Sequence, residues 1–300
     1  MWEFLFQPAG FDIGETGLLA YTPDAPMWWA FVVGLGNTLR VALPGLVLCT
    51  LLALTLALLQ RYGTGIWRGL ARTYIDTVRN VPLLLQLLIW YFLVVEALPD
   101  STQAWHLGPG VWLSKGGMAF PWPVGSAGAT IDTFADGTIV TMLGLRWSLP
   151  EQGAFNISGG AAISPEFLAL LMALSVYTSA FLAEIIRSGL EAVHPSLMEA
   201  AETLGATRWQ QITRVLLPQA LRTIVPGATN QYLNLVKNST LAVAIGYPDL
   251  VSISNTTINQ TGQVLSCLLV MMGTYLTLSL ITAWLMGRFN RRHALKGAGA

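Results

Sequence analysis

The chain has 300 residues, of which 53% are hydrophobic and 11% are charged, and its formal net charge at pH 7 is zero. Soluble domains contain about 25% charged residues, so this composition excludes an ordinary soluble protein, and zero net charge gives nucleic acid no general attraction. Several apolar runs reach the roughly 20 residues that a helix needs to cross a bilayer. An all-α polytopic membrane protein is therefore predicted.

Five transmembrane helices are predicted within a membrane domain at residues 28–290. Residues 1–27 contain four acids but no Lys or Arg, which predicts an extracytoplasmic N-terminal segment. The apolar runs predict spans at residues 28–59, 74–95, 166–186, 221–247 and 264–289. The remaining segments are a long insert at 96–165, a polar loop at 188–219 and a basic tail at 291–300.

The distribution of Lys and Arg predicts the orientation, because these residues are enriched in cytoplasmic loops. They form three groups near span ends: Arg61, Arg68, Arg72 and Arg79; Arg187, Arg208, Arg214 and Arg222; and Arg288, Arg291, Arg292 and Lys296. The opposite side holds only Lys115 and Arg146. The polar loop and the C-terminus are therefore predicted to be cytoplasmic, and the N-terminus extracytoplasmic.

The insert at 96–165 is too long for a simple connector. It combines glycines and prolines with four tryptophans, namely Trp105, Trp112, Trp122 and Trp147. Two interpretations stay open and are compatible: an interfacial segment whose indoles lie at headgroup depth, and a docking surface for an external partner. Residues 138–147 have modest β character, which allows a short hairpin.

The polar loop predicts a helix-turn-helix with its own start and stop signals. Ser196 and Glu199 have the spacing of a capping box. Gly205 suits a left-handed turn at the end of the first short helix. Thr207 and Gln210 have the spacing of a second capping box, which starts the second helix.

Small residues and a proline complete this loop. Ala200 and Ala201 leave room for another surface to approach the first short helix, and Pro218 is predicted to disrupt the second. Two interpretations stay open at this level: an ordinary capped linker between two spans, and a cytoplasmic elbow on which a soluble motor protein pushes.

The fourth predicted span is unusually polar. Asn230, Asn234 and Lys237 follow an i, i+4, i+7 spacing, which puts them on one helix face, and Asn238 and Thr240 flank it. Polar residues inside a span usually face a bundle interior or a wet cavity. The face either forms interhelical hydrogen bonds or lines the path of a zwitterionic substrate, unless Lys237 snorkels to the membrane surface.

Other polar residues in the spans are candidates for the same path. Gln86 in the second span is a pathway candidate. Glu184 and Arg187, three residues apart in the third span, predict a structural ion pair or an element of a gate. Arg40, near the outer end of the first span, is predicted to snorkel rather than bind a ligand.

The polar loop also matches a known pattern. It reads Glu199-Ala200-Ala201, three residues, Gly205, nine residues, Val215, one residue, and Leu217-Pro218. This order resembles the signature of permease subunits of bacterial ABC importers, with Val215 where isoleucine is commonest. Further stretches similar to the polar amino acid permeases of that family lie at 79–86, 179–189, 230–241 and 244–247.

The resemblance covers residues 30–95 and 165–290, and a narrower likeness extends beyond them. Residues 4–14 and the long insert resemble the general L-amino acid permease branch. Members of the subfamily often have Gly-Gln where this chain has Ser196-Leu197, which alters contacts of the loop. Members of the branch often carry an additional N-terminal span, and its absence hints at a truncated or diverged N-terminus.

The resemblance implies a five-span ABC importer permease fold with a cytoplasmic coupling helix-turn-helix, in the bacterial inner membrane. The residues implied to couple to the ATP-binding subunit are Ser196, Glu199, Ala200, Ala201, Gly205 and Pro218. The implied partners are a dimer of ABC ATP-binding subunits, a second permease subunit and a periplasmic amino-acid-binding protein. The branch favours a paralogue over an identical copy as the second permease.

The sequence shows no energy-converting or catalytic site of its own. It has no G-x-x-x-x-G-K-[ST] phosphate loop, and its cysteines and histidines have no metal-ligand spacing. We therefore expect a transport subunit that is not an enzyme and has no cofactor, with ATP and Mg bound by the partner ATPase. The alternatives are an importer of another small polar solute such as an opine, a self-sufficient secondary transporter or channel, and a membrane scaffold.

Overall fold

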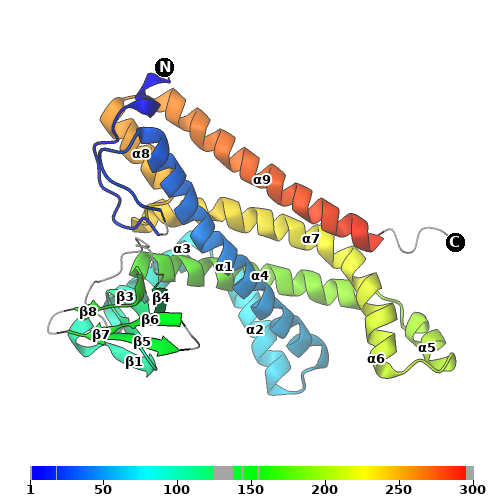
Figure 1. Ribbon diagram of the computed structural model, residues 1–300. Coiled ribbons are helices and arrows are strands. Elements are labelled where there is room, and N and C mark those ends of the chain that lie inside the picture. The colour runs from blue at the N-terminus through cyan, green and yellow to red at the C-terminus, as the bar shows by residue number, and fades with distance from the viewer. Residues whose placement is uncertain (1, 18, 125–137, 143–144, 154–155, 295–300) are drawn as a thin grey trace. The chain divides into compact units, whose positions relative to one another are not determined.

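The computed structural model describes residues 2–17, 19–124, 138–142, 145–153 and 156–294 (Figure 1). The chain divides into two compact units. The first comprises Met1–Leu43, Leu83–Ala173 and Ser239–Met272, and the second comprises Pro44–Pro82, Leu174–Asn238 and Gly273–Ala300.

Three helices in the described part of the chain are long and apolar enough to cross a membrane. They are α1 at Met27–Tyr62, α4 at Pro165–Glu191 and α9 at Val264–Ala294. These helices coincide with the first, third and fifth predicted spans. A fourth span exists only if α2 at Ile66–Asn80 and the helical stretch Leu83–Ala97 are counted together.

The second predicted span is not one continuous helix. After α2 ends at Asn80, Val81 is extended, with φ −101° and ψ 129°, and α3 begins at Leu83 and runs to Phe92. Pro82 explains the break, because a proline has no N–H and pushes the residue before it out of the helical region. A short π-helix, η2 at Leu93–Ala97, follows α3.

The fourth predicted span is also shorter than expected. The helix α7 runs from Leu217 to Asn238, and a 3-10 helix, η5, continues over Ser239–Ile245. The helix α7 is not among those that are long and apolar enough to cross a membrane, because amides and basic side chains lower its hydropathy. The predicted count of five spans is therefore not confirmed. The helix α8, at Leu250–Thr261, lies between η5 and α9.

The prediction of an all-α protein is wrong for the insert, where every described strand lies. These strands are β1 Trp105–Gly108, β2 Val111–Ser114, β3 Gly117–Phe120, β4 Trp122–Val124, β5 Thr138–Met142, β6 Leu145–Leu149, β7 Glu151–Gln152, β8 Ile157–Ser158 and β9 Ala161–Ile163. They form antiparallel sheets with the orders β1-β2-β3-β9, β4-β6-β5 and β7-β8. The expected hairpin near 138–147 is confirmed as β5 and β6, and a 3-10 turn, η3 at Ser101–Gln103, precedes the sheets.

The N-terminal segment packs into the first unit. A 3-10 turn, η1 at Glu3–Phe6, buries Phe4, and Ala9 and Ile13 are also buried. An isolated β-bridge joins Pro8 to Pro26, directly before α1 starts. The segment is thus held by apolar burial and backbone pairing at the start of α1.

Gly34 marks a close contact between α1 and the start of α8 in the first unit. A Cβ added at Gly34 would lie 2.9 Å from Ile253 Cγ1, 3.1 Å from Leu250 Cα and 3.2 Å from the Asp249 carbonyl oxygen. Two of these atoms belong to backbone, so the site cannot relax by a side-chain rotation. Gly34→Ala is therefore expected to lower stability by about 1–3 kcal/mol.

The thermal unfolding of the purified protein in detergent tests this expectation. Gly273→Ala in α9 is the matched control, because its added Cβ would have no heavy atom within 4 Å. Equal unfolding midpoints for the two variants would contradict the close contact.

Candidate functional site

The first short helix of the polar loop, α5, spans Pro195–Thr203 in the second unit. The predicted capping box is wrong, since the N-cap residue is His194 and not Ser196. The His194 Nδ1 accepts a hydrogen bond from the Ser196 backbone N–H at 3.3 Å and lies 2.7 Å from the Ser196 Oγ. Pro195 explains the shift, because proline favours the first helical position and thereby places the cap at the residue before it.

The turn between the two short helices has the predicted form. Gly205 has φ +77°, and its backbone N–H donates to the Glu202 carbonyl at 2.9 Å, while Ala206 N–H donates to Ala201 at 3.0 Å. These bonds satisfy carbonyls at the helix end, as in other left-handed C-terminal turns. The predicted second capping box is also confirmed, with both Thr207–Gln210 bonds present at 2.9 and 3.4 Å.

Pro218 does not disrupt the second helix as predicted. The helix α6 at Arg208–Gln210 passes into a π-helix, η4 at Gln211–Leu216, and then into α7, in which Pro218 is the second residue. A proline ring normally clashes with the carbonyl four residues earlier. The i→i+5 bonding of a π-turn, seen here from Leu217 N–H to Ile212 O, widens the backbone just before the proline and so accommodates its ring.

The loop exposes an unusual amount of apolar surface. The side chains of Leu204 and Trp209 are 88% and 74% exposed, and Leu197 is also exposed. Around them Ser196, Glu199 and Ala200 are exposed as well, and Ala201 is half-buried. We call Leu197, Ala200, Leu204 and Trp209 the hairpin surface. Both α5 and α6 contact η4, so this surface is carried by a folded elbow.

The polar face of α7 faces away from the packed side of that helix. Asn230, Asn234 and Lys237 are exposed, whereas Asn238 and Thr240 are half-buried. The buried residues of α7 lie elsewhere on the helix, at Ala220, Ile224, Val225, Ala228, Leu235 and Val236. The first four polar residues belong to the second unit, and Thr240 belongs to the first.

Gln86 and Thr240 both belong to the first unit. Gln86 is buried in α3, and α3 contacts η5, which contains Thr240. The structure therefore brings the elements of these two candidates together within one unit.

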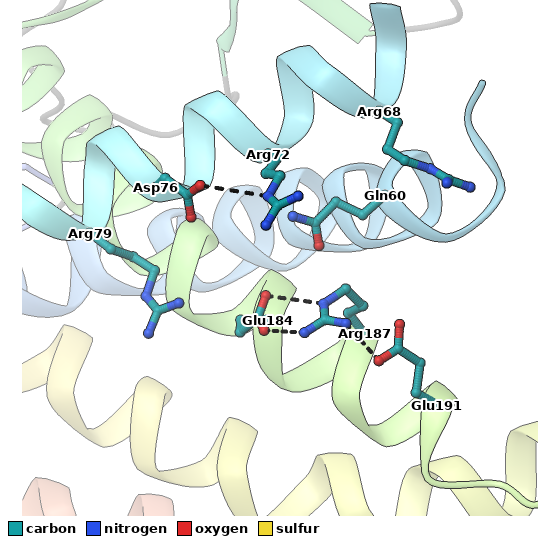
Figure 2. Close-up of a pocket in the computed structure, with 8 residues that line it drawn as sticks. All are labelled: Gln60, Arg68, Arg72, Asp76, Arg79, Glu184, Arg187 and Glu191. Carbon is teal, nitrogen blue, oxygen red and sulfur yellow. Dashed lines mark hydrogen bonds and ion pairs between the residues drawn. The ribbon is translucent and has the colours of Figure 1, made fainter. Parts of the chain in front are cut away.

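Glu184 and Arg187 form an ion pair on α4 that includes a third residue (Figure 2). The Arg187 Nε donates to a Glu184 carboxylate oxygen at 3.2 Å, and Arg187 Nη2 bonds the other oxygen. Arg187 Nη1 also donates to Glu191 at 2.6 Å. Two carboxylates thus hold this guanidinium in place.

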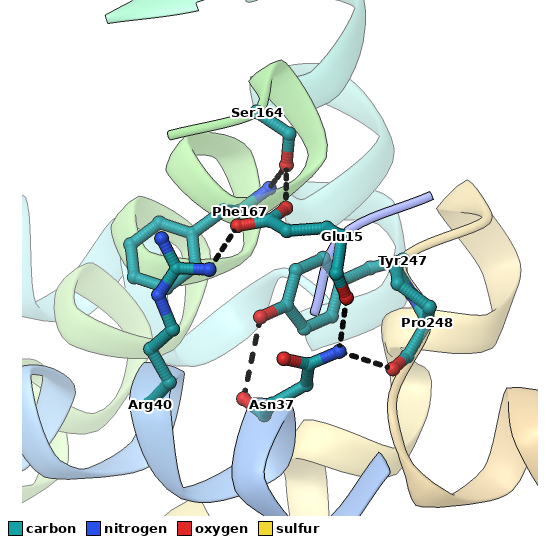
Figure 3. Close-up of polar contacts among 7 residues, drawn as sticks. All are labelled: Glu15, Asn37, Arg40, Ser164, Phe167, Tyr247 and Pro248. Atoms are coloured by element: carbon teal, nitrogen blue, oxygen red, sulfur yellow. Dashed lines mark hydrogen bonds and ion pairs between the residues drawn. The ribbon is translucent and has the colours of Figure 1, made fainter. Parts of the chain in front are cut away.

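A polar cluster around Glu15 was missed by the sequence analysis (Figure 3). The prediction that Arg40 snorkels is wrong, because its guanidinium pairs with the Glu15 carboxylate and lies 5.1 Å from the Phe167 ring centroid. Ser164 Oγ donates to the other Glu15 oxygen at 2.5 Å. Burial raises the pKa of the Glu15 carboxyl, against the opposing effects of Ser164 and Arg40.

Asn37 ties the same cluster to the segment between η5 and α8. Its side-chain amide donates to the Glu15 carbonyl at 2.7 Å and to the Pro248 carbonyl at 2.9 Å. The Tyr247 hydroxyl in turn donates to the Asn37 carbonyl at 3.3 Å. An arginine in an apolar run requires a partner, and that requirement was the available signal for this cluster.

Comparisons with known proteins identify the family. Residues 45–294 match the family described as binding-protein-dependent transport system inner membrane component. Because the match covers most of the chain, the protein belongs to this family.

Several relatives match nearly the whole chain, among them two permease proteins. The putative amino-acid ABC transporter permease protein YhdX of Escherichia coli (strain K12) is 37% identical over 98% of this chain and 85% of its own length. The general L-amino acid transport system permease protein AapQ of Rhizobium johnstonii is 33% identical over 97% of this chain and 83% of its own length.

Solved structures share the fold. A chain of an amino acid ABC transporter crystallised with histidines superposes with a TM-score of 0.59 at 24% identity, covering 88% of this chain and 94% of its own. A chain of the inward-facing MetNI methionine ABC transporter superposes with a TM-score of 0.54 at 18% identity, covering 89% and 97%. The protein is thus an integral membrane component with the architecture of ABC importer permeases.

Proposed function

We propose that the protein is the transmembrane permease subunit of an ATP-driven importer that translocates L-amino acids across the bacterial inner membrane. The family match and the names of both near full-length relatives support this function. The observation that carries it is the hairpin surface, a folded elbow with exposed apolar side chains at the position of the family's coupling signature. Exposed apolar patches of this kind mark docking sites.

The proposed topology has five spans, with the N-terminus periplasmic and the C-terminus cytoplasmic. In it α7 with η5 serves as the fourth span, and residues 74–95, from the end of α2 through α3, serve as the second, despite the break at Pro82. Residues 1–27 and the 96–165 insert are periplasmic, and residues 188–219 and 291–300 are cytoplasmic. The Lys and Arg distribution supports this orientation.

The proposed partners follow from the family. A dimer of ABC ATP-binding subunits, which bind ATP and Mg, docks on the hairpin surface, and a periplasmic binding protein delivers the amino acid. A second permease subunit, more readily a paralogue than an identical copy, completes the pathway. The coupling residues are Ser196, Glu199, Ala200, Ala201, Gly205 and Pro218.

The proposed pathway is lined by the polar residues of α7, α3 and η5. Asn230, Asn234 and Lys237 are exposed on one face of α7, as side chains that face a wet cavity or a second subunit would be. Gln86, Asn238 and Thr240 extend the lining. Glu184 and Arg187 form an element of a cytoplasmic gate.

Reconstituted vesicles test the proposal. The permease is purified with its ATP-binding subunits and reconstituted with the binding protein, and uptake of labelled amino acids is measured with ATP inside the vesicles. ATP-dependent uptake is expected, and an imposed ion gradient without ATP should give none. Uptake of an opine but no amino acid would change the substrate, and gradient-driven uptake without ATPase would overturn the proposal.

A further inference from the structure

A polar cleft lies in the second unit, between the end of α1, the helix α2 and the end of α4 (Figure 2). Its volume is about 320 Å³. The lining residues are Gln60 from α1, then Arg68, Arg72, Asp76 and Arg79 from α2, and Glu184, Arg187 and Glu191 from α4. Four guanidinium groups and three carboxylates therefore surround one small space.

The charges in this cleft are unevenly paired. Arg187 is held by Glu184 and Glu191, so two of the three carboxylates are committed to one arginine. The third, Asp76, lies 3.9 Å from Arg72, and the two side chains are 64% and 79% exposed, an arrangement that contributes little. The arginines of α2 thus leave excess positive charge in the cleft.

Arg68 and Arg79 have contacts that leave their charge available. Arg68 Nη2 donates to the Arg61 carbonyl, a neutral group, at a long 3.4 Å. The Arg79 guanidinium lies 5.3 Å from the Phe181 ring centroid. Neither contact supplies a full negative charge, and the Glu184 carboxylate that also attracts Arg79 is already bonded to Arg187. An anion in the cleft therefore gains the attraction of these groups.

The part of α2 that precedes the second proposed span has the form of a helix that lies at a membrane surface. Arg68, Arg72 and Arg79 share one face, because their spacings of four and seven residues follow the helical repeat. On the opposite face Ile66 and Leu70 are 70% and 55% exposed. Basic and apolar faces on one helix are typical of binding to an anionic bilayer surface.

We propose that this cleft binds a phosphate group, and that an anionic phospholipid headgroup of the cytoplasmic leaflet supplies it. The α2 arginines bind the phosphate oxygens through charge-assisted hydrogen bonds, which suit the guanidinium geometry. The apolar face of α2 places the cleft beside acyl chains, which favours a lipid over a free anion. The proposal rests on the proposed function only for the cytoplasmic side of the cleft.

A bound headgroup would connect lipid composition to the Glu184–Arg187–Glu191 ion pairs. The phosphate and the Glu184 carboxylate both attract Arg79 within one cleft. Anionic lipid is therefore expected to bias the arrangement of these charges on α4, at the place where the proposed function puts a gate element.

Native mass spectrometry of the intact importer complex tests whether the cleft binds an anionic phospholipid. The complex is released from membranes of phosphatidylglycerol and phosphatidylcholine in equal amounts, without ATP or amino acid. The wild type is expected to retain phosphatidylglycerol. The double variant Arg68→Gln with Arg72→Gln is expected to bind phosphatidylglycerol about tenfold more weakly, since each basic residue adds to the attraction of an anionic surface. Lys115→Gln with Arg146→Gln, which removes the same charge from the insert, is the matched control.

A second arm separates a lipid headgroup from a soluble phosphate. Binding of inorganic phosphate to the complex in a neutral detergent is measured by calorimetry at constant ionic strength. Suppose that the complex binds inorganic phosphate, that the double variant does not, and that the complex shows no preference for phosphatidylglycerol. The cleft is then a phosphate site for a soluble ligand and not for a lipid. The site is disproved if the double variant matches the wild type in both arms.

Charge-conserving variants test whether misfolding explains a loss of lipid binding. Arg68→Lys with Arg72→Lys is expected to restore most of the lipid retention. Because neither arm measures transport, a failed uptake assay leaves this test intact, and a failed lipid assay leaves the proposed function intact.

Discussion

Leu204→Asp is expected to abolish ATP-driven uptake and to release the ATP-binding subunits from the purified complex. Leu204 is 88% exposed beside the left-handed turn at Gly205, so it contributes little to the fold and is free to enter a partner's pocket. Central apolar anchors of interfaces contribute about 2 kcal/mol or more, and a buried unpaired carboxylate adds a desolvation cost. The affinity for the ATPase should therefore fall by at least about thirtyfold.

Co-purification and unfolding measurements separate this effect from misfolding. The unfolding midpoint of the isolated permease should change little, because exposed substitutions usually alter stability by less than about 0.5 kcal/mol. Leu107→Asp in β1 is the matched control, since Leu107 is likewise exposed but lies in the insert. Retention of the ATPase by Leu204→Asp at the wild-type level would remove the hairpin surface from the coupling mechanism.

The elbow was largely predictable from sequence because its determinants are local. Thr207, Gln210 and Gly205 act within a few residues of the backbone groups that they satisfy. The error at Ser196 has a local cause as well. Histidine is not among the preferred N-cap residues, so residue preference alone favours Ser196 over His194. Pro195, which suits the first helical position, is the signal for a cap at His194.

The insert was predicted poorly because some of its pairing is not local and its local strands carry weak signals. Met118 of β3 pairs with Ile163 of β9, and β4 pairs with β6 although β5 lies between them in the sequence. Short strands rich in glycine and tryptophan give weak alternation, so their propensity says little about partners. The β5–β6 hairpin was expected from its β-branched residues, whereas the equally local β1–β2 and β2–β3 hairpins gave no such signal.

The Glu15 cluster could not be predicted either, because its residues are far apart in the sequence. Glu15 lies in a segment that was assigned from composition alone, and its partners Arg40 and Ser164 are far from it in sequence. A sequence pattern indicates that Arg40 needs a counter-charge, but four acids in the N-terminal segment were equivalent candidates. The fold selects Glu15 by burying it next to α1 and the start of α4.

Asp249→Asn is expected to stabilise the protein at pH 8 and to remove most of the pH dependence of its stability. Asp249 caps α8, where its Oδ1 accepts the Ser252 backbone N–H at 2.8 Å. Its side chain is fully buried, and Oδ2 has no hydrogen-bond partner among the described residues. Burial raises the pKa of the Asp249 carboxyl to about 7.

The sign of the effect follows from proton linkage. The folded protein holds the Asp249 proton more tightly than the unfolded chain, whose carboxyl has a pKa near 3.9. The contribution of protonated Asp249 to the free energy of unfolding is therefore complete below about pH 4. It is lost as the pH rises to about 7, by a total on the order of 4 kcal/mol. Asparagine keeps the cap but cannot ionise, so the variant avoids this loss.

Unfolding midpoints of the detergent-purified protein at pH 5 and pH 8 measure the difference. The variant should unfold at a higher temperature than the wild type at pH 8, and the gap should shrink at pH 5. Asp100→Asn is the control, because Asp100 is exposed beside Lys115. The raised pKa of Glu15 adds a loss of the same sign, so some pH dependence should remain in Asp249→Asn.

The place where this charge acts makes the test specific. Asp249 stands at the contact where the carbonyl oxygen of the same residue approaches Gly34 of α1, and its charge interacts with the neighbouring Tyr247 side chain. Ionised Asp249 is therefore a buried charge at the contact of α1 with α8. A gap between Asp249→Asn and the wild type that is the same at both pH values would show that the carboxyl does not change its protonation between pH 5 and pH 8, which would contradict its raised pKa.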